Sequence, residues 1–100
     1  MKTPALVKAL EEAHQHLGIA VRRERGPFRG GRCLVDGHEV VVLNKRQPAE
    51  AQLAVLAESL RTLPVEQLYL RPSVRVALED AWAARAAGAV SDGSDAFDEA

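Results

Sequence analysis

The chain has only one cysteine, Cys33, among its 100 residues. An internal disulfide is therefore excluded, and such low cysteine use is typical of proteins in a reducing compartment. The sequence also lacks any run that approaches the roughly 20 apolar residues of a membrane span. Its first residues carry Glu11 and Glu12 and have no long apolar run, unlike a signal peptide. We therefore expect a cytoplasmic protein that does not have a membrane among its partners.

Recognisable catalytic motifs are missing as well. There is no P-loop, GxGxxG or HExxH pattern, and no serine has a His-Asp context. The only soft metal ligands are His14, His16, Cys33 and His38. His14 and His16 are two residues apart, so on a helix they point in different directions. Cys33 and His38 can lie on one hairpin face, but two ligands do not make a zinc site. We therefore expect no metal, no cofactor and no enzymatic activity.

The charge of the whole chain is balanced, with 13 basic and 14 acidic residues and a net charge of -1. Its distribution is uneven: residues 1–50 hold nine Lys or Arg against six Asp or Glu, and residues 51–100 hold four against eight. The two halves therefore carry +3 and -4. The length and the hydrophobic fraction of 47% are typical of one globular domain with a single core.

The first half of the sequence predicts a helix, a strand and a hairpin. A helix is predicted over residues 4–17. Pro4 is favourable at the first helical position, the leucines that follow have helical spacing, and Gly18 is a typical helix-terminating residue. Alternating residues predict a strand over 19–25. Asp36-Gly37 between two apolar runs is the strongest short-range hairpin signal, because a type I′ turn needs positive φ at both positions.

The type I′ turn also predicts the hairpin register. Val35 then lies opposite His38, and the pairs Leu34–Glu39 and Cys33–Val40 follow. One face would carry Cys33, Val35, His38, Val40 and Val42, and the other Leu34, Glu39, Val41 and Leu43. Because both faces are largely apolar, either both are covered within the chain or one is a partner surface.

The second half of the sequence predicts helices. Pro48 begins a helix with one leucine-rich face, and Pro64 stops it. Residues 65–70 predict one helical turn, and residues 72–87 predict a third helix. Residues 88–100 are small and acidic, which predicts a flexible acidic tail behind a single domain of residues 1–87. The order α-β-β-β-α-α predicts an α+β fold, with a three-stranded antiparallel meander packed against helices.

The segment of residues 40–63, VVVLNKRQPAEAQLAVLAESLRTL, resembles the core of the ImmA/IrrE family of zincin-like peptidases. In that family a strand ending near Asn leads through a polar linker into a helix, where Leu-Ala directly precedes HExxH. Here Leu56-Ala57 precedes Glu58, Ser59 and Thr62, which stand at the positions of the first His, the Glu base and the second His. None of the three matches, so no catalytic role is carried over. The resemblance implies a lapsed zincin-like peptidase scaffold that is kept for binding.

The segment Arg22–Arg32 combines many cations with one aromatic residue. Its members are Arg22, Arg23, Arg25, Arg29 and Arg32, with Phe28 among them. Guanidinium groups suit phosphate, and a loop aromatic can stack on an unpaired base, so the segment is a candidate for RNA binding. The alternative is a solvated strand edge that discourages aggregation. The overall acidity of the chain favours this alternative.

The preferred functional hypothesis is a small non-enzymatic domain that acts by protein–protein interaction or self-association. A homodimer joined through the sheet is its simplest form. The hypothesis depends on the two apolar hairpin faces and on the lack of a catalytic set. The predicted contact residues are Leu34, Val41 and Leu43, with Arg22, Arg23, Arg25 and Phe28 at the rim. If this is right, Val41→Glu should break the association.

Overall fold

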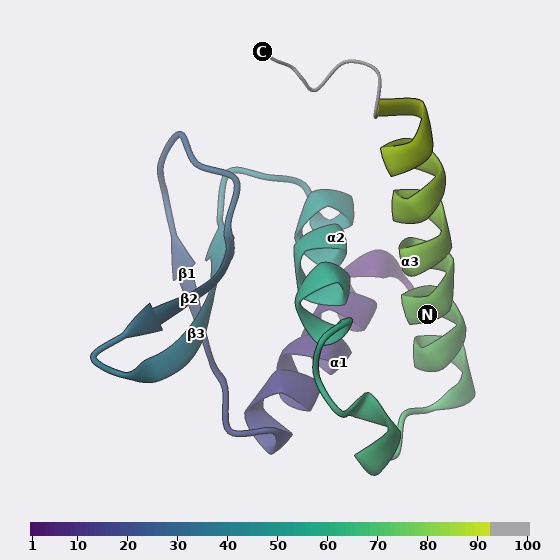
Figure 1. Cartoon of the computed structure of the whole chain (residues 1–100), viewed down its shortest axis with the longest axis horizontal. Helices are drawn as coiled ribbons and strands as arrows, with labels where there is room; N and C mark the ends of the chain where they lie inside the picture. The colour runs from purple at the N-terminus through teal and green to yellow at the C-terminus, as the bar shows by residue number, and fades with distance from the viewer. Residues whose placement is uncertain (93–100) are drawn as a thin grey trace.

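The computed structural model describes residues 1–92, with the backbone alone for residues 88–92. In chain order the elements are α1 (Thr3–His16), β1 (Ala20–Glu24), β2 (Gly31–Val35), β3 (His38–Asn44), α2 (Ala49–Leu60), the 3-10 helix η1 (Val65–Gln67) and α3 (Pro72–Asp92). Figure 1 shows the sheet on one side of the molecule and the helices on the other. The α+β class predicted from the sequence is therefore confirmed.

The three strands form a mixed sheet in the order β1-β3-β2, so the predicted antiparallel meander is wrong. β3 pairs in parallel with β1 and antiparallel with β2. The central position suits β3 because its residues are the most apolar, whereas β1 carries arginines that an edge strand can expose to water. The meander prediction assumed that consecutive strands pair, but residues 25–30 cross the end of β3 instead.

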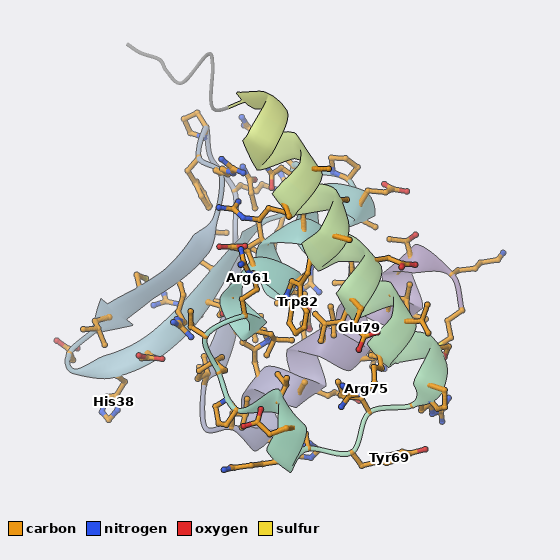
Figure 2. The ribbon with its side chains drawn as sticks, turned by 45° about the vertical axis from the view of Figure 1, so that its right-hand side comes forward. His38, Arg61, Tyr69, Arg75, Glu79 and Trp82 are labelled. Atoms are coloured by element: carbon orange, nitrogen blue, oxygen red, sulfur yellow. The ribbon has the colours of Figure 1, made fainter. Side chains whose placement is uncertain are left out.

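The hairpin itself follows the prediction. Asp36 and Gly37 have φ angles of 52° and 80°, as a type I′ turn requires. The register is also confirmed, since Val35 pairs with His38 and Cys33 with Val40. Figure 2 shows the hairpin extending away from the helices, with His38 close to its tip.

The predicted contact role of Val41 and Leu43 is wrong, because both side chains are fully buried in the core. They lie on the face of β3 that the helices cover. Leu34 shares their face of the hairpin, but it lies towards the tip and is 69% exposed. Of the predicted apolar contact residues, only Leu34 is therefore available to a partner.

The core lies between the covered face of the sheet and the three helices. Its largest fully buried side chains are Leu10 from α1, Leu43 and Val41 from β3, Leu56 and Leu60 from α2, Leu78 from α3, and His14. Each such leucine contributes about 1.5–3 kcal/mol by its removal from water. Trp82 fixes α3 against α2, because its indole N–H donates to the Ala57 carbonyl at 2.6 Å (Figure 2).

The helix ends differ slightly from those expected. Gly18 follows α1 with a φ of 83°, which confirms its predicted role as a terminating glycine. α3 continues past the predicted end at residue 87 to Asp92, and residues 93–100 of the predicted acidic tail lie outside the described residues. Within residues 1–92, no helix is both long and apolar enough to cross a membrane.

Candidate functional site

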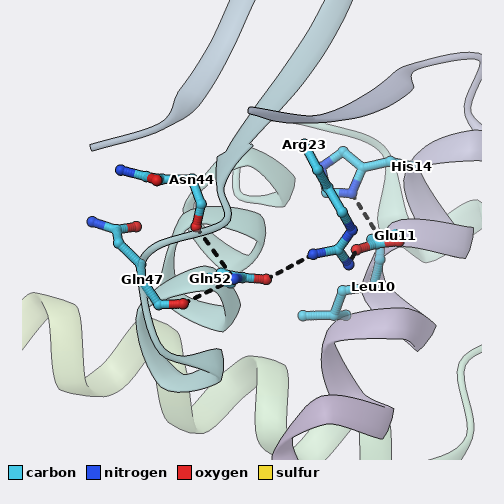
Figure 3. A network of polar contacts seen from close by, with 7 residues as sticks. All are labelled: Leu10, Glu11, His14, Arg23, Asn44, Gln47 and Gln52. Atoms are coloured by element: carbon cyan, nitrogen blue, oxygen red, sulfur yellow. Dashed lines mark hydrogen bonds and ion pairs between the residues drawn. The ribbon is translucent and has the colours of Figure 1, made fainter. Parts of the chain in front are cut away.

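A polar network ties β1 to the helices. Arg23 forms an ion pair with Glu11 of α1 and donates from Nη1 to Gln52 Oε1 of α2 at 3.0 Å (Figure 3). Gln52 in turn donates through Nε2 to the carbonyls of Asn44 and Gln47, at 3.3 and 3.0 Å. Arg23 was predicted at the rim of a partner contact, but its guanidinium is already engaged within the chain.

His14 and Ser59 form a buried pair between α1 and α2. Nδ1 of His14 lies 2.7 Å from the Leu10 carbonyl oxygen, and Nε2 lies 2.9 Å from Ser59 Oγ. A neutral ring protonated on Nδ1 satisfies both contacts, because it donates to the carbonyl and accepts from the hydroxyl. The local sequence around Ser59 gives no sign of this histidine, since His14 comes from a helix distant in the sequence. With a carbonyl at Nδ1 and both side chains buried, the pair serves to join two helices.

This pair predicts a pH dependence of stability. Burial lowers the pKa of His14 from its ordinary value of 6.5; the Leu10 carbonyl opposes that shift and the charge of Arg32 adds to it. The unfolded chain therefore binds the His14 proton more readily than the folded chain. The contribution of His14 to stability is complete above about pH 6.5 and is lost as the pH falls towards the lower folded-state pKa.

We expect the free energy of unfolding to fall by up to about 1.4 kcal/mol per pH unit below about pH 6.5. Urea unfolding between about pH 7.5 and about pH 5.5 measures this loss, above the range in which most carboxylates titrate. The control is His14→Gln, which does not titrate and should show a flatter profile. Equal pH profiles for the two proteins would contradict the buried neutral state of His14.

Arg32 lies across the C-terminal end of α2. It donates to the Ser59 carbonyl at 3.3 Å and to Thr62 Oγ1 at 2.7 Å, and a cation at a helix C-terminus is stabilising. Glu58 pairs with Arg85 of α3 at 2.7 Å. The three positions that align with the HExxH residues are therefore all in polar contacts within the chain. Among residues 1–87, whose side chains the structure describes, no group of three or more His, Cys, Asp or Glu could hold a metal ion.

An open groove of about 1070 Å³ runs between the start of β2 and helices α2 and α3. Its lining includes apolar side chains such as Leu53 and Trp82. It also includes three cations and two carboxylates: Arg29, Arg32, Arg85, Glu50 and Glu58. Two of the cations are engaged, Arg32 with the end of α2 and Arg85 with Glu58, and the two carboxylates offset the charge of Arg29. The groove is therefore a mainly apolar depression and not a strongly charged one.

The arginines of residues 22–32 do not form one platform. Arg22 pairs with Glu24 at 3.2 Å, while Arg23 and Arg32 contact the helices. Arg25 and Arg29 lie exposed in the loop after β1 and form no ion pair with another described residue. Two further cations stand beside them, at positions 45 and 46, because β1 and β3 run parallel and end together. The sequence pattern did not indicate these two cations, since only the parallel pairing of β1 and β3 brings them to this loop.

The two free edges of the sheet differ in character. The edge strand β1 carries Arg22, Arg23 and Glu24, and such charges discourage pairing with another strand. The edge strand β2 ends in Cys33-Leu34-Val35, all exposed and all uncharged. The hairpin extends away from the helices in Figures 1 and 2, so its outer edge is open to approach. An open apolar edge is a template for strand pairing.

In comparisons with models of protein families, with curated proteins and with solved structures, nothing matches this chain significantly. Of the predicted site residues, the structure leaves Leu34, Arg22, Arg25, Arg29 and Phe28 exposed. It places Val41 and Leu43 in the core and engages Arg23 and Arg32 with the helices.

Proposed function

We propose that this chain is a protein-interaction domain that forms a homodimer through the free edge of β2. The observation that carries the proposal is the contrast between the two edges. β1 carries three charged side chains, which discourage strand pairing. Leu34 and Val35 of β2 are uncharged, and they are 69% and 38% exposed. Natural sheets usually protect such an edge, and a second copy of the same edge is the simplest cover.

The hairpin geometry defines which backbone groups are free. In a hairpin with a two-residue turn, the two residues that flank the turn exchange two backbone hydrogen bonds with each other. Along the two strands, such hydrogen-bonded pairs alternate with non-hydrogen-bonded pairs. Val35 and Cys33 therefore bond to β3 through their backbone. The backbone N–H and C=O groups of Arg32 and Leu34 point away from β3, towards solvent.

The same geometry favours one register for the dimer. Cys33 is the middle residue of β2, so full antiparallel overlap of two copies places the two Cys33 residues opposite each other. Arg32 of each copy then lies opposite Leu34 of the other, and each of these pairs exchanges two hydrogen bonds. The two sheets become one continuous sheet about a two-fold axis at Cys33.

Light scattering coupled to size-exclusion chromatography tests the association. We expect a mass of twice 10.8 kDa for the native chain. Leu34→Lys should give a monomer, because it removes the exposed apolar side chain and places a cation opposite Arg32 of the second copy. Tyr69→Lys is the matched control: Tyr69 is 85% exposed and lies far along the chain, and its substitution should leave the dimer intact.

Thiol crosslinking tests the register. In the proposed pairing the Cys33 pair is of the close, non-hydrogen-bonded kind, with Cα atoms about 4.5 Å apart. Because Cys33 is the only cysteine, a short bismaleimide can join two chains only through it. If the chain forms a dimer that does not crosslink, the proposed self-association stands and the proposed register is wrong. A monomer at all concentrations would contradict the proposed function itself.

A further inference from the structure

We propose that the end of the sheet where β1 and β3 finish binds single-stranded nucleic acid, through its phosphates and one unpaired base. We name this region the basic end; it consists of Arg25, Phe28, Arg29, Lys45 and Arg46. The proposal does not depend on the dimer, because the basic end lies in the loops beyond the strands.

The parallel pairing of β1 and β3 assembles the basic end. Glu24 pairs with Asn44 at the last position of both strands, so the loops 25–30 and 45–48 leave the sheet at the same end (Figure 1). The Lys45 N–H donates to the Glu24 carbonyl at 2.8 Å and holds the two loops together. Glu24, at the end of β1, is paired with Arg22, and Glu50, at the start of α2, lines the same groove as Arg29. The four cations of the basic end, all exposed, therefore form a local positive excess on a chain of net charge -1.

The side chain of Asn44 holds the backbone of both loops, 25–30 and 45–48. Its side chain is 4% exposed, and Nδ2 donates to the carbonyls of Gly26 and Phe28 at 2.7 and 2.5 Å. Its Oδ1 accepts the Arg46 N–H at 2.9 Å. One buried amide thus holds the backbone of both cationic loops. A preorganised set of cations loses less conformational entropy when an anionic chain binds.

Phe28 is held on the surface of this loop. Its ring packs over Gly26, where a Cβ atom would lie 2.9 Å from Phe28 Cδ1. Gly30, with a φ of 93°, then passes so close to the Val42 carbonyl oxygen that a Cβ atom would lie 2.7 Å from it. The loop path therefore requires glycine at position 30, whereas a Cβ atom at position 26 would displace the Phe28 ring. It leaves Phe28 36% exposed between Arg25 and Arg29.

An exposed aromatic residue among cations fits single-stranded nucleic acid better than other anions. Guanidinium groups bind phosphate oxygens in forked geometry, and an aromatic ring stacks on an unpaired base. A duplex offers no unpaired base, and its major groove is read by a helix or a two-stranded ribbon, whereas the basic end consists of two loops. An acidic peptide supplies carboxylates for the cations but no base that stacks on the Phe28 ring.

Fluorescence anisotropy with a labelled oligouridylate tests the proposal. We expect binding at low salt, with a slope of log affinity against log salt of up to about -3, since each of four phosphate contacts contributes about -0.7. The combined variant Arg25→Ser, Arg29→Ser, Lys45→Ser and Arg46→Ser should abolish both the binding and the slope. The matched control removes four cations elsewhere, by Lys8→Ser, Arg61→Ser, Arg71→Ser and Arg75→Ser, and should retain most of the affinity.

Phe28→Ala separates base stacking from general attraction to polyanions. Loss of one stacked base should weaken oligouridylate binding by about 5- to 100-fold while heparin binding stays unchanged. No binding at low salt, or equal losses in the two four-cation variants, would overturn the proposal. An unchanged affinity of Phe28→Ala for oligouridylate would also overturn it, because the site would then bind polyanions without reading a base. The Leu34→Lys variant should bind as the native chain does, whatever its association state.

Discussion

The Val41→Glu variant should fail to fold. Val41 lies in the middle of the central strand, fully buried beneath the helices. A carboxylate there has to be desolvated without a partner, or protonated at a cost in free energy, and a loss of about 4 kcal/mol or more is a large part of a typical domain stability of about 5–15 kcal/mol. Circular dichroism and urea unfolding measure the outcome.

Val35→Glu provides the comparison for this prediction. Val35 lies on the other face of the hairpin, next to the turn, and is partly exposed. Its carboxylate can remain in water, so we expect a change in the free energy of unfolding of no more than about 1 kcal/mol. If Val41→Glu folds with native stability, the helices do not cover the face that the structure assigns to them.

The Asn44→Ala variant should lose about 2–4 kcal/mol of stability. The substitution leaves the carbonyls of Gly26 and Phe28 and the N–H of Arg46 without their side-chain partner, and unsatisfied groups of this kind cost about 1–3 kcal/mol each when water cannot replace the bond. Asn44→Asp should be similarly harmful, because a carboxylate cannot donate to the two carbonyls. Urea unfolding measures both variants.

Gln47→Ala is the matched control for Asn44. Gln47 also has an amide side chain and lies in the loop that follows Asn44, but its Oε1 is buried without a hydrogen-bond partner among the described residues. Its removal should therefore change stability by no more than about 0.5 kcal/mol. Equal effects at the two positions would show that Asn44 does not organise the loops.

The sequence was sufficient for the features that depend on neighbouring residues. Asp36-Gly37 predicted both the turn and the strand register, because the turn type and the pairing are linked by local backbone geometry. Gly18 likewise predicted the end of α1. The sheet order was not predictable in the same way, since it depends on pairing between β1 and β3, which are not consecutive in the sequence.

This distinction also explains the error at the hairpin. The two faces were assigned correctly, but nothing in the local pattern indicated which one the helices would cover. Val41 was therefore expected at a partner surface and lies in the core. The apolar character of both faces of β3 did contain a signal, because a strand that is apolar on both faces belongs in the centre of a sheet.

The polar contacts of the site were beyond sequence reasoning because they join distant segments. The Ser59 hydroxyl contacts His14 of another helix, and the Asn44 side chain donates a hydrogen bond to a loop that lies many residues earlier in the sequence. A single polar residue at the end of an apolar strand was the only sign of the role of Asn44. The resemblance to zincin-like peptidases stays a prediction.

Amide hydrogen exchange at Arg32 and Leu34 tests the central claim, self-association through β2, most directly. These two N–H groups point away from β3 and gain hydrogen-bond partners only when a second β2 strand pairs with them. At high protein concentration we predict protection of both amides, and loss of that protection on dilution while the Cys33 amide stays protected. Fast exchange of Arg32 and Leu34 at every concentration would contradict the account.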